Sequence, residues 1–148
     1  MNEVEITPAR WADIDAIHRL EVASFPSPWR REFFENELDS ESRLHLVARK
    51  DGRVIGYVFA MWFFDEMHVN KIAVADPARR QGIAKALMQR CLEFARANSI
   101  TTISLEVRQS NSGAQAFYDS LGFNAHYIRP RYYPDGESAV VMVRKLED

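Results

Sequence analysis

The chain has 148 residues, a length that fits a single domain. Hydrophobic residues make up 47% of it and charged residues 27%, which predicts a packed core, and the formal net charge of −2 excludes a broadly basic nucleic-acid surface. The single cysteine, Cys91, excludes an internal disulfide, and the four scattered histidines show no zinc-binding spacing.

The sequence carries no segment that predicts export or membrane insertion. Its N-terminus lacks the apolar core of a signal peptide, and the longest apolar run, 54–64, is too short to span a membrane. We therefore expect a cytoplasmic protein with no metal centre and no direct contact with nucleic acid or membrane.

The N-terminal half predicts a strand, two helices and then three strands. Apolar residues at helical spacing, from Trp11 through Ile14 and Ile17 to Val22, indicate the first helix. Asp51-Gly52 between two apolar runs is a strong hairpin signal. The predicted elements are a strand at 4–7, helices at 8–25 and 30–38, and strands at 43–50, 54–64 and 67–74.

The C-terminal half alternates helices and strands. A helix begins near Gly82 and runs to about residue 98, with Cys91 on its apolar stripe as a buried thiol. A strand at 101–108 alternates apolar and polar residues, and a capped helix follows that ends at Gly122. The last two strands are predicted at 123–133 and 138–146, joined around 134–136.

This element order combines hairpins with helical crossovers. We therefore predict an α/β (α+β) fold in which a mixed central sheet of about seven strands is flanked by about four helices. No linker or repeat divides the chain, so residues 1–148 are expected to form one domain.

The stretch RRQGIAKAL contains the first candidate site. Gly82 at a helix start leaves the backbone accessible, and unpaired N–H groups there suit a phosphate, with Arg79 and Arg80 adding positive charge. An ordinary basic turn is the alternative, because the stretch lacks both the ending of a nucleotide-triphosphate loop and the three-glycine dinucleotide pattern.

Two further residues could take part in catalysis. Glu106 lies on the polar side of its strand, where it is either a general base or a solvated glutamate. Tyr118 lies on the apolar stripe of its helix, where it is either a proton donor or a core residue. Aromatic residues around a cleft would suit an extended peptide, with core packing as the alternative; they are Phe25, Trp29, Tyr132 and Tyr133.

These motifs resemble a known family. In NKIAVADPARRQGIAKALMQ, residues Arg79, Gly82 and Ala84 match the acetyl-CoA-binding pattern of the Gcn5-related N-acetyltransferases (the GNAT family). The stretches FPSPW, LEVRQSNSGAQAFYDSLGF and RPRYYPDGESAVVM are similar to those of bacterial ribosomal-protein-alanine N-acetyltransferases. The chain differs from the commonest form of that subgroup at Pro130 and Ser138, both in the region expected to contact substrate.

The resemblance implies roles for individual residues. Glu106 would be the general base, Tyr118 would lie at the thioester sulfur as proton donor, and Asn111 would contact the CoA arm. Trp29, Tyr132 and Tyr133 would bind substrate. Backbone groups of Ile72, Ala73 and Val74 would hold the pantetheine arm and thioester carbonyl, and Arg79, Arg80, Gln81, Gly82, Ile83 and Ala84 would hold the pyrophosphate.

The resemblance also implies the reaction. The protein would transfer acetyl from acetyl-CoA to the N-terminal amine of a protein, with the N-terminal alanine of a small-subunit ribosomal protein as the expected target. The amine would attack directly within a ternary complex. The alternatives are acetylation of lysine side chains or small amines, and a non-catalytic acetyl-CoA-binding sensor.

Overall fold

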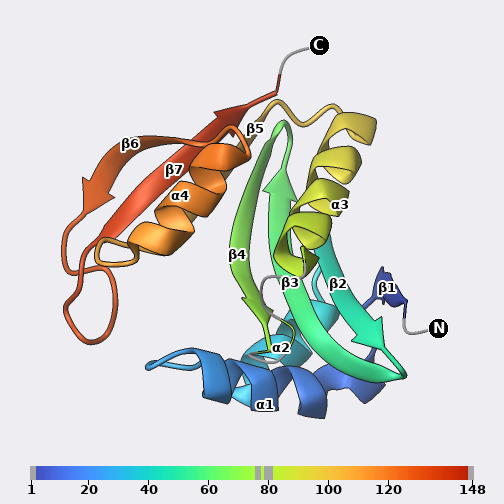
Figure 1. Ribbon diagram of the computed structural model, residues 1–148. Coiled ribbons are helices and arrows are strands. Elements are labelled where there is room, and N and C mark those ends of the chain that lie inside the picture. The colour runs from blue at the N-terminus through green and yellow to red at the C-terminus, as the bar shows by residue number, and fades with distance from the viewer. Residues whose placement is uncertain (1–2, 76–77, 79–81, 147–148) are drawn as a thin grey trace.

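A computed structural model describes residues 3–75, 78 and 82–146. They form a seven-stranded sheet with the strand order β1-β2-β3-β4-β5-β7-β6 (Figure 1). The predicted order of elements is confirmed. The strands are β1 Val4–Pro8, β2 Arg43–Lys50, β3 Arg53–Phe63, β4 Glu66–Val74, β5 Thr102–Arg108, β6 Asn124–Arg129 and β7 Ala139–Lys145. The helices are the 3₁₀ turn η1 Trp11–Asp13, then α1 Ile14–Ser24, α2 Arg31–Leu38, α3 Ile83–Ala97 and α4 Ser112–Ser120.

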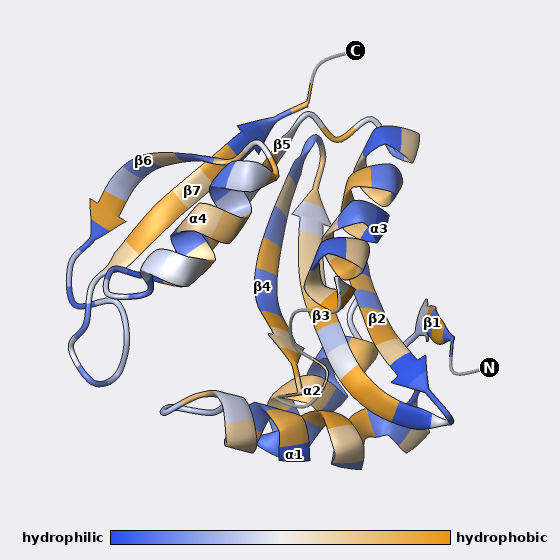
Figure 2. Ribbon diagram, viewed as in Figure 1, coloured by the Kyte–Doolittle hydropathy of each residue, from blue (hydrophilic) through white to orange (hydrophobic). Residues whose placement is uncertain are grey.

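The helices cover the two faces of the sheet and divide the core into two clusters. On one face, α1 and α2 bury Ile14, Ile17 and Phe34 (Figure 1). Full burial of a side chain such as Phe34 contributes about 1.5–3 kcal/mol. On the other face, α3 alternates hydrophobic and hydrophilic residues, as a helix with one side against a sheet requires (Figure 2). Its buried residues are Ile83, Leu87, Met88, Cys91, Leu92 and Ala95.

The sheet is mixed, as predicted, because β4 and β5 are parallel and every other neighbouring pair is antiparallel. The parallel pairing is short: it joins Glu66–Val69 of β4 to Thr102–Leu105 of β5. Both strands continue beyond it, to Val74 and Arg108. Among the described residues, the sheet therefore divides between β4 and β5 at this point.

A β-bulge in β4 lies at the same place. Phe59 of β3 pairs with Lys71 and Ala60 pairs with Val69, so Asn70 is the extra residue. The bulge exchanges the faces of β4: Val69 packs in the cluster under α3, whereas Ala73 packs in the cluster under α1 and α2. The strand thus presents a new set of side chains beyond the end of the parallel pairing.

Two element boundaries differ from the sequence prediction. The first helix was expected to include Trp11 and Val22 on its buried stripe, but each is 53% exposed. Residues 11–13 form a separate 3₁₀ turn because Asp13 accepts the N–H of Arg10 and pairs with Arg49 of β2. The strand expected at 123–133 ends at Arg129, because the next residue is a proline, which cannot donate to a strand ladder.

Gly122 ends α4 in a left-handed conformation, with φ of 88°. The Phe123 N–H donates to the carbonyl of Tyr118 and the Gly122 N–H to that of Asp119, the pattern of a Schellman cap. An added Cβ would also lie 3.4 Å from Nε of Arg144.

We therefore expect Gly122→Ala to lower the free energy of unfolding by about 1–2 kcal/mol, the usual cost of a left-handed residue with a Cβ. Urea unfolding measures this change. Gly113→Ala, in the first turn of the same helix with a negative φ, is the matched control and should not destabilise the protein. Equal stability of the Gly122→Ala and wild-type proteins would show that a Cβ at this position causes no backbone strain.

Candidate active site

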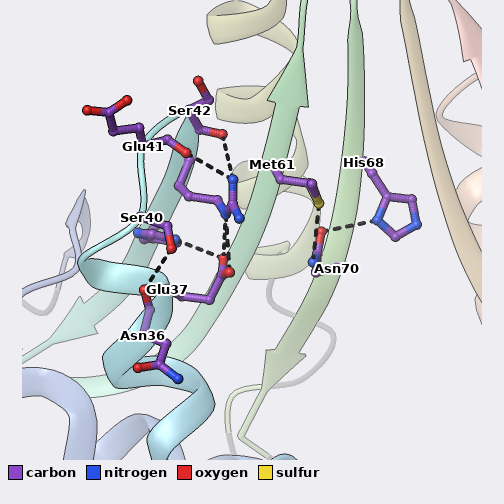
Figure 3. A network of polar contacts seen from close by, with 10 residues as sticks. Asn36, Glu37, Ser40, Glu41, Ser42, Met61, His68 and Asn70 are labelled. Carbon is purple, nitrogen blue, oxygen red and sulfur yellow. Dashed lines mark hydrogen bonds and ion pairs between the residues drawn. The ribbon is translucent and has the colours of Figure 1, made fainter.

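A carboxylate–imidazole pair lies where the β4–β5 pairing ends. Glu106 points away from the cluster that contains its neighbours on β5, and His68 reaches it from β4, with Nε2 2.7 Å from Oε1 of Glu106. The other ring nitrogen of His68 lies 3.1 Å from Oδ1 of Asn70, the bulge residue, whose side chain also contacts Met61 (Figure 3). The Tyr132 hydroxyl donates to the same oxygen of Glu106 at 3.3 Å.

The two groups of this pair shift each other's pKa. Burial raises the pKa of Glu106, but the hydrogen bond and charge of His68, with Arg129 and Tyr132, outweigh it and hold that pKa below its ordinary value. Burial lowers the pKa of His68, but Glu106 and Asn70 outweigh it and raise that pKa. The pair therefore favours a carboxylate beside an imidazolium. The Glu106 side chain is 9% exposed and that of His68 31%, so the imidazole is the group nearer to solvent.

The segment that follows β6 forms one wall beside this pair. Tyr132 and Tyr133 pack edge to face, and the Arg108 guanidinium lies 4.1 Å from the centre of the Tyr133 ring. Arg108 also donates to Asp135 at 2.8 Å and to Glu137 at 2.9 Å. The structure thus brings both predicted tyrosines to the side of Glu106.

The loop between α1 and α2 forms a second wall. Trp29 packs against Phe34 with ring centres 5.5 Å apart. The backbone N–H of Trp29 donates to Oε2 of Glu21 at 2.8 Å. Glu21 is fully buried, and Lys71 of β4 pairs with it at 3.1 Å. The Tyr57 hydroxyl donates to the second oxygen of Glu21.

Sequence reasoning did not identify Glu21, Lys71 or His68 as site residues. Glu21 had a signal, because it continues the buried stripe of Ile14 and Ile17 as a charged residue at helical spacing. His68 and Lys71 had no such signal, since their partners depend on which strands and helices become neighbours.

Tyr118 and Asn111 lie on α4, on the opposite face of the sheet from Glu106. Tyr118 is 7% exposed and packs against Phe117 and Phe123, so the structure does not place it in contact with Glu106. Burial raises the pKa of its phenol, with further contributions from Cys91 and Tyr133, which keeps it protonated. The side-chain Oδ1 of Asn111 accepts the Ala114 N–H at 3.0 Å, so Asn111 is the N-cap of α4.

A mostly apolar cavity of about 250 Å³ opens between the end of β4, the start of α3 and Phe117 of α4. Gly82 is the N-cap of α3 with φ of 77°, and an added Cβ would meet nothing within 4 Å. The helix start therefore combines accessible N–H groups with an apolar recess. The predicted residues Arg79, Arg80 and Gln81 lie outside the described residues. The lining residues are Val74, Ala78, Gly82, Ile83, Ala84, Lys85 and Phe117.

Ile72, Ala73 and Val74 form the part of β4 that continues beyond the pairing with β5. On their other side they pair with Val58, Tyr57 and Gly56 of β3. This part of β4 thus runs from the Glu106 pair to the cavity at Gly82, which Val74 lines.

Cys91 is buried in α3, and burial raises the pKa of its thiol to about 12, so it is not a nucleophile. Within the described ranges, no group of three or more histidine, cysteine, aspartate or glutamate side chains is arranged to hold a metal. In the same part of the chain, no helix is both long enough and apolar enough to cross a membrane.

Comparison with known proteins identifies the family. The sequence profile of the Acetyltransferase (GNAT) family matches residues 14–123. The chain is 32% identical over 140 residues to the ribosomal protein bS18-alanine N-acetyltransferase of Escherichia coli K12, covering 93% of this chain and 94% of that protein. It is 33% identical over 157 residues to an N-alpha-acetyltransferase of Sulfurisphaera tokodaii, covering 97% and 94%.

The fold agrees with that assignment. The crystal structure of the ribosomal-protein-S18-alanine N-acetyltransferase from Escherichia coli superposes with a TM-score of 0.91 at 30% identity, covering 99% of this chain and 96% of that one. The chain therefore belongs to the GNAT acetyltransferase family. It is an acetyl-CoA-dependent N-acetyltransferase with the fold that the sequence motifs predicted.

The effect of Glu106 on the pKa of His68 can be tested without an activity assay. We expect His68 to titrate above its ordinary pKa of 6.5 in the wild type. In Glu106→Gln it should titrate lower, because burial and Arg129 then act without the carboxylate. NMR titration of the His68 imidazole signals in the two proteins measures both. An unchanged His68 curve would show that Glu106 does not set its pKa.

Proposed function

We propose that this enzyme acetylates the N-terminal amine of a protein, and that its target is the N-terminal alanine of a small-subunit ribosomal protein. The whole chain would act as a single N-acetyltransferase domain in the cytoplasm. The observation that supports this most directly is the Glu106–His68 pair, which lies at the end of the β4–β5 pairing between two aromatic walls. The names of the bacterial relatives support the choice of target.

Acetyl-CoA would enter along the part of β4 beyond its pairing with β5 and supply the thioester whose acetyl group is transferred. Backbone groups of Ile72, Ala73 and Val74 would hold its pantetheine arm and orient the thioester carbonyl. The start of α3, from Gly82 to Ala84 with the preceding 79–81, would hold the pyrophosphate through its N–H groups. The open recess at Gly82 and the apolar lining of the cavity fit these two parts of the molecule.

Glu106 would remove the proton from the attacking amine, directly or through a water. Its lowered pKa keeps it ionised at neutral pH, and the more exposed imidazolium of His68 would first release its own proton to solvent and then take the proton that Glu106 received. An α-amino group has a reference pKa of about 7.7–8.0 against about 10.4 for lysine, so an N-terminal amine is the easier acceptor to deprotonate.

Tyr118 would donate a proton to the departing sulfur from the other face of the sheet, with Asn111 against the CoA arm. The division between β4 and β5 supports this arrangement, because a thioester lying in it would adjoin both faces. These steps would take place in a ternary complex, in which the amine attacks the thioester carbonyl before the C–S bond breaks, with peptide on the α1–α2 face and CoA on the α3–α4 face. Trp29, Tyr132 and Tyr133 would line the acceptor side.

The acceptor is tested with two peptides incubated with acetyl-CoA and the enzyme, and read by mass spectrometry. One peptide has a free N-terminal alanine and blocked lysines, and the other has a blocked N-terminus and free lysines. We expect acetylation of the first alone, with turnover lowered at least about a hundredfold in Glu106→Gln, as loss of a general base implies. Acetylation of the second alone would assign the enzyme to lysine or small amines, and acetyl-CoA binding without transfer would favour a sensor.

The proposed position of the acetyl-CoA pyrophosphate is tested by a substitution at Gly82. We expect Gly82→Val to raise the acetyl-CoA dissociation constant at least about tenfold, because a branched side chain would fill the recess beside the helix N-terminus. Isothermal titration calorimetry measures this constant. Gly52→Val is the matched control, because Gly52 has the same φ of 77° and the same open surroundings but lies in the β2–β3 hairpin. Unchanged affinity of Gly82→Val for acetyl-CoA would show that the pyrophosphate does not bind at this position.

A further inference from the structure

Two cations extend from the strands just beyond the end of the β4–β5 pairing. Lys71 lies two residues after Val69, the last paired residue of β4, and Arg108 lies three residues after Leu105, the last of β5. Each contacts a different loop, and neither has a role in the proton transfers proposed above.

Lys71 holds the loop between α1 and α2. Its ammonium lies 3.1 Å from Oε2 of Glu21 and 3.7 Å from the centre of the Phe25 ring. The same carboxylate oxygen accepts the backbone N–H of Trp29 at 2.8 Å. One fully buried carboxylate thus joins the end of α1, the loop and β4. Because such a charge is costly without a partner, Lys71 determines whether the carboxylate keeps this position.

Arg108 holds the segment before β7 in the same way. It donates to Asp135 and Glu137 and stacks on Tyr133 at 4.1 Å. The second oxygen of Glu137 accepts the backbone N–H of Ser110 at 2.8 Å. Each cation therefore contacts both a carboxylate and an aromatic ring, and the ring belongs to the wall beside that cation. Each carboxylate also accepts a hydrogen bond from a backbone N–H.

We propose that Lys71 and Arg108 are positioning residues that fix the two walls of the acceptor site, 25–29 and 132–137, on either side of the division in the sheet. Neither wall belongs to a helix or strand, so these contacts replace the hydrogen-bond ladders that hold regular elements. The effect on peptide binding rests on the proposed function, whereas the effect on the two loops does not.

The kinetic test uses Lys71→Met and Arg108→Met, which keep most of each apolar stem and remove the charge. We expect each to raise the KM for the alanine peptide about tenfold, because a displaced wall costs acceptor binding. The change in kcat of Lys71→Met should stay within about twofold, with its acetyl-CoA affinity unchanged. Lys145→Met, on an exposed position of β7, is the matched control and should change none of these values.

The structural test measures amide hydrogen exchange. We expect faster exchange of the Trp29 amide in Lys71→Met and of the Ser110 amide in Arg108→Met, each without an effect on the other. The double variant Glu21→Gln/Lys71→Met keeps a neutral acceptor for the backbone N–H of Trp29. If Lys71→Met alone unfolds, the double variant should restore folding, and its KM for the peptide should stay raised. The double variant therefore separates the loss of the Lys71 contacts from a loss of folding.

Two results would overturn the proposal: unchanged exchange at both amides, or a loss of kcat in Lys71→Met with peptide KM unaltered. If the wild type transfers no acetyl to the peptide, the proposed function fails, and the exchange data still decide whether the two cations hold their loops.

Discussion

The parallel pairing of β4 with β5 stops after Val69 and Leu105, and the rest of the site depends on that short register. Both strands continue, and Ile72–Val74 pair with β3 on the side away from β5. The bulge at Asn70 turns the β4 side chains to the opposite face at the same point. A single interruption in the ladder thus lies beside both the bulge and the pair formed by His68 and Glu106.

Charge at this interruption is arranged in pairs. Glu21 is a fully buried carboxylate and Glu106 a half-buried one, and each has a basic partner from β4, His68 for Glu106 and Lys71 for Glu21. They differ in surroundings: the imidazole of His68 is partly exposed and can exchange protons, whereas Glu21 is enclosed by Tyr57, Trp29 and Lys71. The first arrangement suits proton transfer and the second suits a fixed structural contact.

The comparisons and the structure inform different levels of the function. Relatives at 32–33% identity establish the family and the transfer of acetyl to nitrogen. The two loops that we propose as walls of the acceptor site contact Lys71 and Arg108 of this chain. Family membership therefore constrains the chemistry more strongly than the identity of the acceptor.

The sequence alone determined the elements and their faces, because periodicity and caps are local: Gly122 adopts the positive φ expected after the C-terminus of a helix, and Glu106 lies opposite its apolar neighbours. It did not determine the early end of β6 or the 3₁₀ turn at 11–13. The contacts of His68 and Lys71 were decided by tertiary structure, because strand order, register and the bulge bring together residues 38 and 50 positions apart. Such long-range pairings leave no trace in the spacing of neighbouring residues.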